Sequence, residues 1–135
     1  MKQYVLDTDT CVDVLRNRRD VVTALKQHSP VDLAVSTMTE AELRHGCLLS
    51  KRPEINLNLL EQFLGLVTVL PFESKAADEH AYIREKLKAN PIGAHDFVIA
   101  SAARATNRIL VTSNVEEFGR VPGLEIENWR RAWPT

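Results

Sequence analysis

Four side chains that end in oxygen lie where the sequence predicts strand ends or helix starts: Asp7, Glu42, Asp96 and Asn114. Carboxylates a few ångströms apart repel, and at neutral pH at least one of them takes up a proton unless a cation compensates. Oxygen-only ligation favours Mg²⁺ or Mn²⁺ over Zn²⁺. The four histidines show no ligand-pair spacing such as HExxH, which argues against a zinc hydrolase. The pattern therefore indicates a site for a hard divalent cation, provided that the fold brings these residues together.

The elements that must position these side chains alternate along the chain. Short apolar runs predict buried strands at 4–6, 33–35, 66–70 and 108–111, with a short last strand at 124–126. Helices are predicted between them, at 10–16, 20–28, 39–50, 57–64, 74–89 and 96–106, with Thr39 and Ser74 as caps. Short buried strands separated by helices favour an α/β fold, a three-layer α/β/α sandwich around a mostly parallel sheet.

In such a sheet, strand C-termini and the N-termini of the following helices share one edge. Asp7 follows the first strand, Glu42 lies in the first turn of a helix, and Asn114 follows the strand at 108–111. Asp96 joins them if its turn lies at the same edge. Each residue has an ordinary structural alternative, because Asp7 and Asp96 suit helix caps, Glu42 suits a capping box and Asn114 suits a turn. Caps do not have to converge, whereas metal ligands do.

Length and composition narrow the class of protein. The 135 residues predict a single domain spanning 1–135, and 44% hydrophobic with 26% charged residues is typical of a globular chain. A net charge of -1 excludes a strongly basic nucleic-acid binder at the level of the whole chain, but not a local basic face. Two cysteines are too few for a disulfide framework or a thiolate zinc site. The chain shows no apolar signal core and no apolar segment of membrane-spanning length, so we expect a cytoplasmic protein without membrane contact.

Four segments resemble, in order and at the family's spacing, the PIN-domain proteins, and specifically the VapC-type toxins of bacterial toxin–antitoxin pairs. They are 4–11 around Asp7, 39–46 around Glu42, 92–100 around Asp96, and 110–114 with the closing residues Phe118, 121–124 and 127–129.

The resemblance implies a PIN-like fold and an endoribonuclease that depends on Mg²⁺ or Mn²⁺ and cuts structured RNA such as tRNA. It also implies a homodimer that a VapB-type antitoxin inhibits, with operator DNA reached only through the antitoxin. Carried over by position, the metal-binding and catalytic residues are Asp7, Glu42 and Asp96, with Asn114 at the fourth position. Thr112 matches the family's hydroxyl near that position.

One residue departs from the family's pattern, because Asp9 stands where asparagine is common. We expect Asp9 to cap the first helix. The run 6–10 also resembles the first motif of haloacid-dehalogenase-type phosphohydrolases, in which Asp7 would be the nucleophile and Asp9 the acid/base. That class needs a downstream lysine, and no lysine follows Asn114. A third alternative is a non-enzymatic binding module that buries its acids against a basic partner.

Two further features have more than one interpretation. The apolar face of Leu57, Leu60, Phe63 and Leu64 suits either an antitoxin groove or ordinary core packing. His95 adjoins Asp96, but at helical spacing it points about 100° away. We therefore expect a surface or core histidine there more than a substrate contact.

Overall fold

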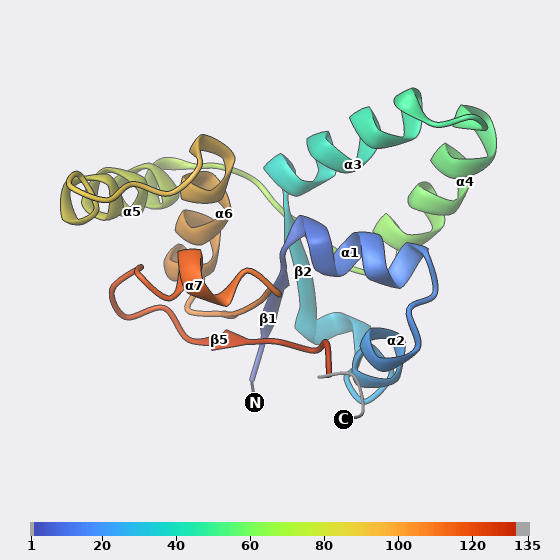
Figure 1. The fold of residues 1–135 in the computed structure, drawn as a ribbon, viewed down its shortest axis with the longest axis horizontal. Coiled ribbons are helices and arrows are strands. Elements are labelled where there is room, and N and C mark those ends of the chain that lie inside the picture. The colour runs from blue at the N-terminus through green and yellow to red at the C-terminus, as the bar shows by residue number, and fades with distance from the viewer. Residues whose placement is uncertain (1, 132–135) are drawn as a thin grey trace.

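The central sheet has five strands, all paired in parallel, in the order β3-β2-β1-β4-β5. The computed structural model describes residues 2–131 (Figure 1). The strands are β1 (Tyr4–Leu6), β2 (Leu33–Ser36), β3 (Thr68–Leu70), β4 (Ile109–Val111) and β5 (Ile126–Glu127). In the register of β1 and β4, Leu6 pairs with Val111, so the residues that follow both strands leave the sheet side by side.

Helices cover both faces of the sheet. They are α1 (Thr8–Leu15), α2 (Arg19–Leu25), α3 (Thr37–Leu49), α4 (Pro53–Leu64), α5 (Ser74–Lys86), α6 (Ala94–Ala105) and the short α7 (Val115–Phe118), with a 3₁₀ turn at Pro30–Asp32. In Figure 1, α1 to α4 lie on one side of the strands, and α5 to α7 lie on the other. This arrangement confirms the predicted three-layer sandwich.

The strands divide the interior into two cores because their side chains alternate between the two faces. Tyr4 and Leu6 pack in one core with Leu60 and Phe63, whereas Val5 packs in the other with residues of α5 and α6. All three β1 residues are buried, as expected for a parallel strand covered on both faces. The apolar side chains of α4 that we considered for a groove therefore belong mainly to the core: Leu60 and Phe63 are buried, and Leu57 and Leu64 are partly buried against them.

Helix starts differ from the prediction at several points. Ser36 caps α3, its side chain accepting from the Thr39 N–H at 3.1 Å, so Thr39 lies inside the helix and the predicted cap is wrong. Glu42 consequently lies in the second turn instead of the first. Ser74 is the first residue of α5, whose capping position is Glu73. A local preference for serine or threonine therefore does not reveal where these two helices start.

The segment Asn128–Arg131, which we call the C-terminal strap, crosses back to the first two helices. The Arg130 guanidinium donates to both oxygens of Asp13 at 2.7 and 3.0 Å, and the Arg131 N–H donates to Asp20 at 2.8 Å. Trp129 stacks on His28 with 5.3 Å between ring centroids. The strap thus fastens the last described residues to α1 and α2. Both cysteines, Cys11 and Cys47, are free and buried.

Candidate active site

Asp7 is the first residue after β1 and the N-cap of α1. Its Oδ1 accepts from the Thr8 N–H at 2.8 Å, and its Oδ2 accepts from the Thr112 hydroxyl at 2.7 Å. The residue is only 6% exposed. Burial, followed by the charge of Asp9, raises the pKa of Asp7 to about 7, against the opposing bonds from Thr112 and Thr8. A capping role and a role at the site therefore coincide in this one side chain.

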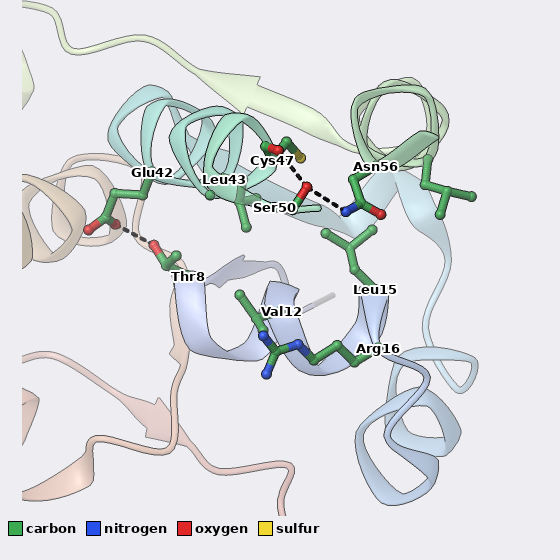
Figure 2. Close-up of a pocket in the computed structure, with 11 residues that line it drawn as sticks. Thr8, Val12, Leu15, Arg16, Glu42, Leu43, Cys47, Ser50 and Asn56 are labelled. Carbon is green, nitrogen blue, oxygen red and sulfur yellow. Dashed lines mark hydrogen bonds between the residues drawn. The ribbon is translucent and has the colours of Figure 1, made fainter. Parts of the chain in front are cut away.

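Glu42 reaches the same edge from the second turn of α3. Its Oε1 accepts from the Thr8 hydroxyl at 2.5 Å, and its Oε2 lies 3.0 Å from Nδ1 of His95 (Figure 2 shows the Thr8 contact). The capping-box alternative for Glu42 is wrong, because its carboxylate bonds side chains of two other helices.

Asp96 lies in the first turn of α6, half-buried beside another acid. Burial, then a hydrogen bond with Glu117, then the charges of Glu117 and Glu42 raise the pKa of Asp96 to about 6. Bonds from the Asn114 side chain and the Gly93 N–H lower the pKa of Glu117. When this pair binds one proton, the proton therefore resides on Asp96. A side chain at Gly93 would crowd the pair, since a Cβ there would lie 3.0 Å from Asp96 Oδ2.

Asn114 links this pair back to the first strand. Its Nδ2 donates to Glu117 at 2.8 Å, and its backbone N–H donates to the Thr112 hydroxyl at 3.0 Å. Thr112 is fully buried and binds Asp7, so it joins the two groups of acids.

The contacts close into a ring. The ring contains Asp7, Thr8, Glu42, His95, Asp96, Glu117, Asn114 and Thr112. Each member is joined to the next by a hydrogen bond or a peptide bond, except that Asp96 and Glu117 are two neighbouring carboxyl groups beside Gly93. All five residues predicted from the sequence are members. Within residues 2–131, however, no three His, Cys, Asp or Glu side chains are grouped tightly enough to hold a metal ion as they stand. The acids are neighbours at one edge, each bonded to a different partner.

The donor set nevertheless fits the chemistry of Mg²⁺ or Mn²⁺. Its ligating atoms are carboxylate and amide oxygens, and burial beside like charges raises two of the carboxyl pKa values. A hard cation is the group that relieves such repulsion, and those metals prefer oxygen ligands.

Asp9 is not a cap, so that expectation is wrong. It is the second residue of α1, and its Oδ2 accepts from both the N–H and the hydroxyl of Ser113, at 3.2 Å for the N–H. It therefore ties α1 to the loop that carries Thr112 and Asn114. A carboxylate held in this way is poorly placed to be the acid/base of the phosphohydrolase alternative.

Sequence reasoning missed three members of the ring: Thr8 and Glu117, which it did not consider for the site, and His95, which it considered only as a substrate contact. The signal for Glu117 was its place three residues after Asn114, which puts both on one face of a helix. That spacing brings the two side chains together only if the segment is helical, and the short helix α7 was not predicted.

A groove with a cavity volume of about 240 Å³ opens beside Glu42 (Figure 2). Its lining comes from α1, α3 and α4 and comprises Thr8, Val12, Leu15, Arg16, Glu42, Leu43, Gly46, Cys47, Ser50, Asn56 and Leu59. Gly46 leaves open space over α3, with no atom within 4 Å of an added Cβ. The groove thus leads from the ring across an apolar floor, and it differs from the α4 face that the sequence indicated.

Comparisons with known proteins identify the family of the fold. The PIN domain family model matches residues 4–124. The chain is 34% identical over 131 residues to the tRNA(fMet)-specific endonuclease VapC of Salmonella typhimurium, covering 96% of this chain and 99% of that protein. It is 35% identical over 131 residues to Ribonuclease VapC2 of Haemophilus influenzae, covering 96% and 99%.

Among solved structures, DNA-bound VapBC from Salmonella typhimurium has a chain that superposes with a TM-score of 0.89 at 33% identity, covering 96% of this chain and 100% of that one. VapBC2 of Rickettsia felis bound to a promoter DNA fragment gives a TM-score of 0.87 at 34% identity, covering 94% and 98%. The five-stranded parallel sheet is thus that of a PIN domain. The chain belongs to the PIN-domain family, among the VapC ribonucleases.

Proposed function

We propose that this chain is an endoribonuclease toxin that depends on Mg²⁺ or Mn²⁺ and hydrolyses phosphodiester bonds in structured RNA such as tRNA. The ring around Asp7, Glu42 and Asp96 carries this proposal, because it gathers oxygen ligands at the edge where α/β enzymes bind substrates. Burial raises the pKa of two of them, Asp7 and Asp96. The nuclease names of its relatives support the reaction class. An RNA substrate of this kind places the protein in the cytoplasm.

Asp7, Glu42 and Asp96 would hold the cation, with Asn114 assisting directly or through water. When bound, such a cation lowers the pKa of water and stabilises a leaving oxygen. Thr112 keeps Asp7 pointing to the site. Asp96, whose pKa is raised to about 6, acts as a ligand only in its ionised form. Water is the proposed nucleophile and O3′ the proposed leaving oxygen. The phosphorus–O3′ bond therefore breaks, O3′ takes up a proton, and the products carry a 5′-phosphate and a 3′-hydroxyl.

Two substitutions test these roles by single-turnover cleavage of RNA with Mg²⁺. Asp7→Ala is expected to lower the rate by several orders of magnitude, since it removes a buried charged ligand. Asn114→Ala is expected to cost less, because a neutral amide is the weaker ligand. An Asp7→Ala protein that cleaves at the wild-type rate would contradict the assignment.

We further propose a homodimer, formed by a single domain over 1–135 and inhibited by a VapB-type antitoxin that alone contacts operator DNA. The groove supports the antitoxin, because its apolar floor begins at Glu42 and suits an apolar peptide segment that carries a basic residue at one end. An arginine reaching Asp7 or Asp96 would displace the cation and block RNA together.

The test of this arrangement is inhibition by the cognate antitoxin with its candidate arginine replaced by alanine. We expect the antitoxin to stay bound through the groove while inhibition weakens. Full inhibition by the alanine variant would rule out direct occlusion of the acids.

A further inference from the structure

Glu42 is the one acid of the site that is held at both carboxylate oxygens by residues adjacent to the other two acids. Thr8, which directly follows Asp7, binds its Oε1 at 2.5 Å, and His95, which directly precedes Asp96, lies 3.0 Å from its Oε2. We infer that Thr8 and His95 are positioning residues that fix the Glu42 carboxylate for cation binding. The inference rests on the proposed metal-dependent function and assigns these two residues a role in it.

The direction of the Thr8 bonds follows from the number of protons available. A carboxylate only accepts, and a hydroxyl has one proton, so Thr8 donates to Glu42 and must accept from the Thr39 hydroxyl 3.1 Å away. Thr39 is fully buried, and its own N–H is bound by Ser36 at the cap of α3. The Thr8 hydroxyl is therefore held by α3 at the same time as it holds Glu42.

The direction of the hydrogen bond between His95 and Glu42 follows from the same rule. Because Glu42 only accepts, Nδ1 must carry the proton in this contact, and it does so in one neutral tautomer as well as in the charged ring. The contact therefore does not depend on the charge of His95. The ring is 60% exposed, so it adds little to the core. Among residues 2–131, its one hydrogen-bond partner is Glu42.

Fixing this side chain has a functional consequence. A glutamate has three side-chain torsions, and ordering it costs entropy that a cation would otherwise have to offset on binding. A carboxylate offers about four lone-pair sites, and Thr8 and His95 occupy two, which leaves the others for a cation. Partners that orient a metal ligand typically change metal affinity by about 10–100-fold.

The experiment measures binding of Mn²⁺ alone to the full chain, by electron paramagnetic resonance of free Mn²⁺. We expect His95→Ala to weaken binding by about 10–100-fold. His95→Asn is expected to restore most of the affinity, because its amide nitrogen lies near the position of Nδ1. His95→Gln is expected not to, because its nitrogen lies near that of Nε2. Likewise Thr8→Val should weaken binding and Thr8→Ser should restore it.

A matched control is His45→Ala, which removes an exposed histidine from the helix that carries Glu42 without touching either bond. It should bind Mn²⁺ as the wild type does. The inference is overturned if His95→Ala and Thr8→Val also bind like the wild type, or if glutamine restores binding as well as asparagine. In those cases a loss of Mn²⁺ binding in Asp7→Ala would still support the proposed function. A wild-type chain that binds no Mn²⁺ would overturn both.

Discussion

Asp7 and Asp96 share a physical situation, because each carboxyl is withdrawn from water and has a second acid beside it. Burial is the largest cause of both raised pKa values, and the neighbours are Asp9 for Asp7 and Glu117 for Asp96. With a pKa of about 7, Asp7 is only partly ionised at neutral pH. Proton release and cation binding at this residue are therefore linked, and affinity for the cation should rise with pH.

The raised pKa of Asp7 predicts how stability depends on pH. The folded state holds this proton more tightly than the unfolded state, in which the pKa is near 3.8. The stabilisation that comes from this tighter proton binding is thus fully present below pH 3.8 and is lost as pH rises through about 7. Asp7→Asn should remove this dependence and raise the melting temperature at pH 8 by about 3–5 °C for each kcal/mol gained.

Thermal melts of both proteins from pH 5 to 8, without added metal, measure this effect. The difference in melting temperature should widen toward high pH. A constant difference across the range would show that the Asp7 carboxyl does not titrate as described.

At the residue scale the sequence predicted Asp7, Glu42 and Asp96 because a parallel sheet gathers residues at its carboxyl edge. The partners of these acids could not be predicted in the same way. The contact of Thr8 with Glu42 and that of Asp9 with Ser113 join residues 34 and 104 positions apart. Such pairs depend on how helices pack after the sheet has formed, and local preferences carry no information about them.

At the scale of elements, the strands and the longer helices followed from apolar periodicity, whereas helix boundaries and α7 did not. The sequence analysis predicted Thr39 as the cap of α3, whereas β2 ends at Ser36 and Ser36 caps the helix. α7 has four residues, too few for a periodic pattern. Its absence from the prediction explains why Glu117 was missed.

The C-terminal strap gives a prediction at this scale. Asp13 is 8% exposed, and its charge is compensated by two bonds from Arg130. Arg130→Ala would leave this carboxylate buried without its partner. We expect a loss of about 1–3 kcal/mol in unfolding free energy, less than for a fully buried pair because Arg130 is partly exposed.

Urea denaturation measures this loss, and Arg131→Ala is the matched control, because its contact with Asp20 is made by the backbone N–H. The control should change the unfolding free energy by less than about 0.5 kcal/mol. Equal effects of the two substitutions would mean that the Arg130–Asp13 pair does not fasten the strap.

For the whole molecule, the order of the strands explains why distant segments share a site. β1 lies at the centre, between β2 and β4, so the residues that follow these strands or begin the next helices surround Asp7. The fold therefore brings four short sequence segments to one edge and leaves the groove of α1, α3 and α4 open beside them.

The described helices include none that is long and apolar enough to cross a bilayer.

Cation binding should be visible in the stability of the whole chain. Mg²⁺ that binds only the folded state stabilises it by about 2.7 kcal/mol at a hundredfold excess over Kd. A Mg²⁺ titration followed by thermal melting, without antitoxin, measures this shift. Asp96→Asn should raise the melting temperature without metal and reduce the shift with it. An unchanged melting temperature across the titration would contradict cation binding by the acids.

The most direct test of the account is the chemistry of the cleaved ends, using an RNA substrate with a single 2′-deoxy sugar at the cleaved position. If water is the nucleophile, the 2′-hydroxyl is not needed for the reaction. We therefore predict cleavage with Mg²⁺, giving a 5′-phosphate and a 3′-hydroxyl, and no such products from Asp7→Ala. Loss of cleavage with binding retained, or a 2′,3′-cyclic phosphate from the unmodified RNA, would contradict a metal-dependent hydrolysis at these acids.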